Sequence, residues 1–301
     1  MLSLRFPLLF FQVPSALGQN LLAPTREWMD YLKHLNSDTH GAKPIDPATA
    51  YLNLLAGILS SSSLECDPAQ MDVQYLRCLD PFRRGQVTPR VGITMAGHKR
   101  MQNIKELMMR VHESQTKGCY LEAGVWRGGM SVFAAAVVEA YGMNRSVYLC
   151  DSYQGLPPPR KGSLRADESV YTDNPTFKAL LSKGEEEVVA NFRFYGVPLT
   201  KVRTIRGFFV DSLPVLRDEF MRRGEKISVL RLDGDMYDST IDILYNLYDL
   251  VEVLGFIVID DWGWAEGTSV EKARWGAKAA ILDFRSIHRI EDAAHVIHDV
   301  D

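Results

Sequence analysis

Three aspartates stand where carboxylates could hold a metal ion. Asp233 closes one apolar run of strand length, and the pair Asp260 and Asp261 closes the next. If these runs are neighbouring strands, the carboxylates meet, and they would stay largely protonated unless a cation neutralised them. All-oxygen ligands suit Mg²⁺, which keeps waters that a substrate can displace. The pattern favours a magnesium site over simple capping of the following turns, whereas for Asp235 and Asp238 we favour capping.

A glycine-rich turn follows an earlier apolar run. Gly124, Gly128 and Gly129 do not have the spacing of a dinucleotide fingerprint, and the lysine of a P-loop is missing. Glycines let a ligand approach the backbone closely, and the carboxylate of Glu122 suits a cationic ligand better than a pyrophosphate. The alternative is a tight strand-to-helix turn with no ligand.

The next run ends at Asp151, where a carboxylate would accept hydrogen bonds from both hydroxyls of a ribose. An aspartate at a strand end is as often a turn former. Together with a glycine turn unsuited to phosphates, Asp151 favours an adenosine ligand without phosphates. S-adenosylmethionine, with its sulfonium and amino groups, fits this charge pattern.

These candidates require a sheet that brings strand ends together. From Cys119 onward, short apolar runs alternate with helical stretches, which predicts βαβ units and an α/β fold with a mostly parallel sheet covered on both faces. The predicted strands are Cys119–Val125, Ser146–Cys150, Val202–Ile205, Ile227–Leu232 and Phe256–Ile259. Ligands of such sheets bind outside the carboxyl ends of the strands, so Ser152 beside Asp151, and Gly207 and Phe208 at the next strand end, join the candidate site.

Helical spacing marks the segments between and before the strands. Tyr51–Ser60 and Met101–Val111 carry apolar residues at that spacing. Ser239–Val251 is the clearest helix, and its predicted apolar face consists of Ile241, Leu244, Tyr245, Tyr248 and Val251. The basic pair Lys99 and Arg100 is interpreted as part of a solvated helix face.

Composition excludes several other classes of protein. The 301 residues carry 34 Lys and Arg against 38 Asp and Glu, a net charge of −4 without the basic cluster that nucleic-acid binding requires. The four cysteines form no C-x-x-C pair, so neither a zinc knuckle nor a disulfide framework is expected. No H-E-x-x-H or G-x-S-x-G motif is present, which argues against a zinc hydrolase or an esterase.

The N-terminal region is expected to lie outside the main fold. Residues 1–45 contain many helix breakers, and residues 1–18 combine one positive charge, a short apolar stretch broken by proline and glutamine, and small residues. We interpret residues 1–45 as an extension and the protein as cytoplasmic, with a signal peptide and the secretory pathway as the alternative. No window supplies the roughly 20 apolar residues of a spanning helix.

Five strings in the chain together resemble the macrocin O-methyltransferase family of class I S-adenosylmethionine-dependent enzymes. They are TMAG at 94–97, LEAGVWRGG at 121–129, DSYQGLPPP at 151–159, LRLDGDMYDST at 230–240 and VIDDWG at 258–263. The likeness covers about residues 46–290. It implies a Rossmann-like methyltransferase domain over residues 46–301, whose first part, about 46–115, is a helical lid.

The resemblance also implies an activity and roles for single residues. It implies a magnesium-dependent O-methyltransferase, which in studied members acts on sugar hydroxyls of macrolide antibiotics, and a homo-oligomer. Glu122, Gly124 and Asp151 match cofactor-binding residues, with Thr94 and Met95 as a lid over the cofactor. Asp233, Asp260 and Asp261 match the metal ligands, and Asp233 also matches the general base.

Two features depart from the family pattern. The chain ends at Asp301, where the family usually continues into a final strand, and the stretch Trp264–Trp275 is longer than expected. The first raises the expectation of an incomplete domain, and the second leaves the acceptor open. Alternatives are a catechol-type methyltransferase, a hydrolase or phosphotransferase that uses the aspartates, and a non-catalytic binding protein that keeps the fold.

Overall fold

The computed structural model describes residues 8–11, 45–61, 89, 91–164, 167–168, 171, 175–262, 276–290 and 294–297. Its centre is a seven-stranded sheet in the order β4-β3-β2-β5-β6-β1-β7, and every pair of neighbouring strands is parallel. The strands are β1 (Leu8–Phe11), β2 (Cys119–Ala123), β3 (Val147–Asp151), β4 (Val202–Arg206), β5 (Ile227–Leu232), β6 (Val251–Ile259) and β7 (Ala294–Ile297). The predicted α/β fold with a parallel sheet is confirmed.

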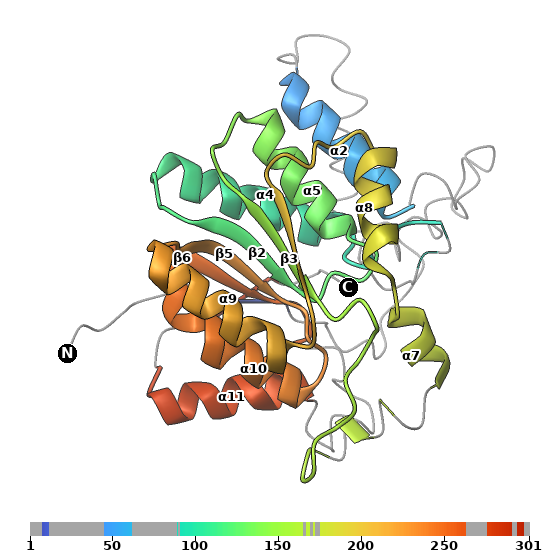
Figure 1. The fold of residues 1–301 in the computed structure, drawn as a ribbon. Helices are drawn as coiled ribbons and strands as arrows, with labels where there is room; N and C mark the ends of the chain where they lie inside the picture. The colour runs from blue at the N-terminus through green and yellow to red at the C-terminus, as the bar shows by residue number, and fades with distance from the viewer. Residues whose placement is uncertain are drawn as a thin grey trace, which may run out of the picture.

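Helices cover both faces of the sheet (Figure 1). The bounds of the helices on one face are Pro47–Leu59 for α2, His98–Glu113 for α4, Gly129–Ala140 for α5 and Glu185–Phe194 for α8. Those on the other face are Phe209–Arg223 for α9, Tyr237–Leu247 for α10 and Gly276–His288 for α11. Each face has its own buried apolar cluster against the sheet, as expected for parallel strands that are buried on both sides. The short helix α7 (Pro175–Leu181) precedes α8.

The five predicted strands correspond to β2 to β6. Their ends agree within two residues except at β6, which begins at Val251 rather than at Phe256. Val251 was placed in the preceding helix, but α10 ends at Leu247 and a short 3-10 turn carries the chain into β6. The helices predicted at 51–60 and 101–111 are confirmed as parts of α2 and α4.

The apolar face predicted for α10 is wrong in part. The buried residues are Ser239, Thr240, Ile243, Leu244 and Leu247, whereas Tyr245 is 48% exposed. The buried stripe begins with two small hydroxyl residues that pack beside the turn at Gly234, and an apolar pattern does not mark such residues as buried.

The prediction that residues 1–45 lie outside the fold is wrong for Leu8–Phe11. This segment forms β1, which lies between β6 and β7 in the sheet. Four apolar residues in a row suit a short buried strand as well as an apolar leader segment, so the pattern alone did not separate the two. A last strand, β7, is also present and pairs with β1.

Two further expectations concern residues outside those described. The long stretch Trp264–Trp275 and most of residues 1–45 belong to this part of the chain. Among the described helices, none is both long and apolar enough to cross a membrane.

Candidate functional site

The candidate site is a cavity of about 550 Å³ at the carboxyl ends of the central strands. The predicted site residues that line it are Thr94, Met95, Glu122, Gly124, Asp151, Ser152, Phe208, Asp233, Asp260 and Asp261. Gly207 is not among the lining residues. Its N–H donates to the carbonyl oxygen of Asp151 at 2.9 Å, so it joins the ends of β3 and β4.

The three aspartates predicted as metal ligands lie together. Asp233, Asp260 and Asp261 each offer a carboxylate oxygen, and these oxygens all lie within 4.8 Å of one another. Oδ1 of Asp260 is buried and has no hydrogen-bond partner among the described residues. A buried carboxylate oxygen without a partner is costly, so this donor set fits a hard cation such as Mg²⁺.

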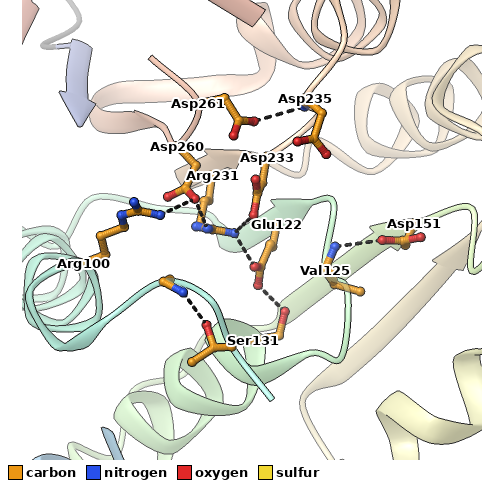
Figure 2. A network of polar contacts seen from close by, with 12 residues as sticks. Arg100, Glu122, Val125, Ser131, Asp151, Arg231, Asp233, Asp235, Asp260 and Asp261 are labelled. Atoms are coloured by element: carbon orange, nitrogen blue, oxygen red, sulfur yellow. Dashed lines mark hydrogen bonds and ion pairs between the residues drawn. The ribbon is translucent and has the colours of Figure 1, made fainter. Parts of the chain in front are cut away.

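A buried arginine that the sequence analysis did not single out lies beneath these carboxylates (Figure 2). The side chain of Arg231 is 3% exposed, and its guanidinium is within 2.6 Å of Glu122, 2.7 Å of Asp233 and 2.8 Å of Asp260. The expectation that only a bound cation would relieve the repulsion among the aspartates is therefore incomplete. A partial signal was present, because Arg231 lies in β5 two residues before Asp233, and alternation along an extended chain places the two side chains on the same face.

A second arginine reaches the same group from α4. Nη1 of Arg100 lies 3.0 Å from Oδ2 of Asp260, and the Arg100 side chain is 13% exposed. The interpretation of Arg100 as part of a solvated helix face is wrong, because the first turn of α4 faces the strand ends (Figure 2). Its carboxylate partner is distant in sequence, so the local pattern gave no sign of the pair.

The two arginines separate the pKa values of the aspartates. Burial alone would raise the pKa of Asp260, but Arg100 and Arg231 hold this pKa below its usual value. Burial raises the pKa of Asp233 to about 6, against the attraction of Arg231. Burial and the nearby carboxylates raise the pKa of Asp235 to about 8 and that of Asp261 well above its usual value. The site therefore combines one firmly ionised carboxylate with others that bind a proton more readily.

Glu122 is not a free negative charge beside the glycine turn, as its position in the sequence suggested. It is 1% exposed and ion-paired to Arg231, and it accepts hydrogen bonds from the hydroxyls of Ser131 and Tyr120. Burial raises the pKa of Glu122 to about 7, while Arg231 and Ser131 oppose the rise. The residue still lines the cavity, so a cationic ligand would share it with Arg231.

Gly124 serves the packing of two strand ends. Its φ is +93°, and a Cβ atom there would lie 1.8 Å from the carbonyl oxygen of Asp233. The N–H of Asp233 donates to the carbonyl of Ala123 at 2.9 Å, which holds these backbones together. This close approach gives the glycine a structural role, and the residue also lines the cavity.

Asp151 forms a turn and also borders the cavity. Its Oδ2 accepts the N–H of Val125 at 2.8 Å, and its Oδ1 accepts the N–H of Tyr153 at 2.7 Å. Burial raises the pKa of Asp151 despite these bonds, which favour the charged form. A carboxylate has about four lone-pair positions, so hydroxyl groups of a ligand can still be accepted.

The segment that contains Thr94 and Met95 is tied to two helices. The carbonyl of Ile93 accepts the N–H of Gly129 at 3.0 Å, and the N–H of Ile93 donates to the carbonyl of Leu59 at 2.9 Å. The hydroxyl of Thr94 accepts the N–H of Ala96 at 3.1 Å. These bonds hold the segment over the start of α5, at the wall of the cavity.

The capping interpretation of Asp235 and Asp238 is wrong. The N-cap residue of α10 is Met236, which has no side-chain capping bond. The N–H of Tyr237 instead donates to Asp167, which is distant in sequence. Asp238 accepts the N–H of Arg160 at 3.2 Å. Asp235 lines the cavity, and its N–H donates to Oδ2 of Asp261 at 3.0 Å.

Comparison with known proteins gives consistent matches. The family model of macrocin O-methyltransferase matches residues 51–300. A demethyldecarbamoylnovobiocin O-methyltransferase of Streptomyces niveus is 32% identical over 236 residues, which cover 76% of this chain and 83% of the relative. A tetracenomycin-C 4'-O-methyltransferase of Streptomyces olivaceus, named for a dimethoxy-rhamnosyl compound, is 32% identical over 249 residues. The alignment covers 82% of this chain and 88% of the relative.

Among solved structures, the O-methyltransferase NovP is similar to this chain with a TM-score of 0.67 and 30% sequence identity. The alignment covers 82% of this chain and 93% of NovP.

Proposed function

The chain belongs to the macrocin O-methyltransferase family, and we propose that it transfers a methyl group from S-adenosylmethionine to a sugar hydroxyl of a glycosylated natural product, with the help of Mg²⁺. The observation that carries the proposal is one cavity bounded both by Asp151 and by the group Asp233, Asp260 and Asp261. A ribose-binding carboxylate and a metal-binding group would thus serve one reaction.

The cofactor side of the site consists of residues at three strand ends and in the segment that contains Thr94 and Met95. Asp151 would accept hydrogen bonds from the ribose hydroxyls, and Glu122 would face the cationic part of the ligand. Thr94 and Met95 would close the cavity over it, and Ser152 and Phe208 also line the cavity. When bound, S-adenosylmethionine supplies an already activated methyl group, so the protein has to align an acceptor oxygen and remove its proton.

The metal side uses Asp233, Asp260 and Asp261 as ligands. When bound, Mg²⁺ lowers the pKa of an acceptor hydroxyl and helps to orient it. Arg100 and Arg231 keep Asp260 ionised through its Oδ2 and leave its buried Oδ1 without a hydrogen-bond partner among the described residues. This arrangement favours a divalent cation over a further protein side chain as the missing partner.

Two carboxylates are candidates for the general base. Asp233 is the residue that the family resemblance implies, but its Oδ2 lies 2.7 Å from Arg231. Asp235 lines the same cavity two residues later, and no ion pair to it is found among the described residues. A carboxylate that is not paired with an arginine accepts a proton more readily than one that is. The geometry therefore supports Asp235 as a second candidate, with Asp233 then acting as a metal ligand.

The acceptor class rests on the relatives. The tetracenomycin relative is named for a rhamnosyl compound, and the family for macrocin. A sugar hydroxyl is therefore the proposed acceptor.

The proposal is tested by methyl transfer from labelled S-adenosylmethionine to a rhamnoside and to a catechol, with Mg²⁺ and with a chelator. We expect transfer to the rhamnoside that the chelator abolishes. Asp233→Asn should abolish turnover and weaken Mn²⁺ binding, while Asp235→Asn should reduce turnover at least 100-fold and keep Mn²⁺ binding if Asp235 is the base. Asp249→Asn, a surface carboxylate with 69% side-chain exposure, is the matched control and should be unchanged.

Other results would overturn parts of this assignment. Full activity of Asp233→Asn would remove both of its proposed roles. Transfer to the catechol alone would indicate a catechol-type enzyme. Transfer to neither acceptor, together with no binding of S-adenosylmethionine, would indicate a non-catalytic binding protein.

A further inference from the structure

Arg231 lies where the cofactor side and the metal side of the site meet. It is on β5 opposite Glu122 of β2 in the register of the sheet, and β6, which ends at Ile259 just before Asp260, flanks β5 on the other side. The Arg231 side chain is 3% exposed, so its charge is removed from water. A buried guanidinium is tolerated only when ion pairs and hydrogen bonds compensate its desolvation.

The guanidinium divides its nitrogens between the two sides. Nη1 lies 2.6 Å from Oε1 of Glu122 and 2.7 Å from Oδ2 of Asp233, so one nitrogen joins a cofactor-side and a metal-side carboxylate. Nη2 lies 2.8 Å from Oδ2 of Asp260. Three carboxylates from three strands thus take their orientation from one planar group (Figure 2).

We propose that Arg231 is a positioning residue that orients Glu122 for the cofactor and Asp233 and Asp260 for the metal through the fork of a single guanidinium. The inference rests on the proposed function and adds to it a shared support for both ligand sites. A lysine keeps the charge but has one nitrogen on a flexible stem, so it cannot hold three carboxylates in the same geometry.

Arg100 provides the matched comparison. It pairs with the same Oδ2 of Asp260 at 3.0 Å, but it comes from α4, and among the described side chains it forms no hydrogen bond or ion pair with Glu122. Arg100 therefore supports the metal side alone. Substitutions of Arg231 and Arg100 would change ligand binding alike if only charge or packing near the site mattered. The proposed role predicts that only substitution of Arg231 also weakens cofactor binding.

The test compares Arg231→Lys with Arg100→Lys in two binding measurements. S-adenosylhomocysteine affinity is measured by calorimetry without metal, and Mn²⁺ affinity by electron paramagnetic resonance without cofactor. For Arg231→Lys we expect both dissociation constants to rise tenfold or more. For Arg100→Lys we expect the Mn²⁺ constant to rise at least threefold and the S-adenosylhomocysteine constant to stay within twofold of wild type. Circular dichroism and thermal melts check that both variants fold.

A second pair of variants keeps the inference falsifiable if Arg231→Lys does not fold. In Glu122→Gln, Nη1 of Arg231 loses one ionised partner and pairs more strongly with Asp233. Arg231 then competes more strongly with a metal ion for Asp233. The Mn²⁺ dissociation constant should therefore rise at least fivefold, although Glu122 is not a proposed metal ligand. Asp151→Asn removes the same charge from the cavity without touching Arg231 and should change the Mn²⁺ constant at most twofold.

The outcomes separate the inference from the proposed function. The inference alone is overturned if the wild type binds both ligands and a folded Arg231→Lys binds them with unchanged affinity. It is also overturned if Glu122→Gln and Asp151→Asn change the Mn²⁺ dissociation constant equally. Failure of the wild-type protein to bind S-adenosylhomocysteine overturns the proposed function and the inference with it.

Discussion

At the scale of single residues, Glu122 shows how a buried carboxyl is balanced in this site. Burial favours its neutral form, while Arg231 and the hydroxyl of Ser131 favour the ionised form, and the result is a pKa of about 7. Such a group changes charge near neutral pH. Its ionisation therefore depends on hydrogen bonds that substitutions can remove one at a time.

Ser131→Ala should destabilise the protein by about 1.5–3 kcal/mol at pH 8, because it removes a hydrogen bond to a buried carboxylate. The cost should be smaller at pH 5. The pKa of Glu122 in the folded state lies above its unfolded value, so this group's contribution to stability falls as pH rises toward 7. Loss of the Ser131 hydroxyl raises the folded pKa further and deepens that fall.

Urea denaturation at the two pH values measures this difference, with wild type as the reference. An equal loss of stability at pH 5 and pH 8 would show that Ser131 does not stabilise the charge of Glu122.

Residue positions along the strands were predictable to different degrees. Asp151, Asp233, Asp260 and Asp261 could be assigned to one site because the carboxyl ends of parallel strands converge. Arg231 was not assigned. Its spacing of two residues from Asp233 indicates one partner, but nothing in the local sequence indicates Glu122 or Asp260. Those partners come from neighbouring strands, and only the sheet order brings them together.

At the scale of elements, α10 depends on a residue far from it in sequence. The N–H of Tyr237 in its first turn donates to Oδ2 of Asp167 at 2.9 Å. Gly276, the first residue of α11, packs so closely that a Cβ atom there would lie 2.2 Å from Oδ1 of Asp167. A cap of this kind cannot be read from the helix and its flanks, which is why the sequence analysis assigned capping to Asp235 and Asp238 instead.

Asp167→Ala should lower the free energy of unfolding by about 1–2 kcal/mol, the usual cost of a lost helix cap. Asp167→Asn keeps an acceptor oxygen and should cost less than half as much. Chemical denaturation at pH 7 measures both changes. Equal losses for the two variants would show that the oxygen acceptor is not what stabilises the start of α10.

At the scale of the whole molecule, the alternation of apolar runs and helices predicted the parallel sheet and its two helical layers (Figure 1). The strands β1 and β7, which are neighbours at one end of the sheet, were missed. Each has four residues, and they pair with each other although they lie near opposite ends of the chain. Local patterns contain no information about such a pairing. The family, by contrast, could be predicted from sequence, since five strings in the right order are far more specific than any single turn.

The proposed function requires this fold to bind S-adenosylmethionine at the end of β3. Calorimetry of S-adenosylmethionine with the wild-type protein and with Asp151→Ala, each with and without Mg²⁺, tests it most directly. We predict micromolar binding by the wild type and at least a tenfold weaker affinity of a folded Asp151→Ala, because the ribose hydroxyls lose their carboxylate. Equal affinities of the two proteins, or no binding by the wild type in either condition, would show that Asp151 does not hold the cofactor in this way.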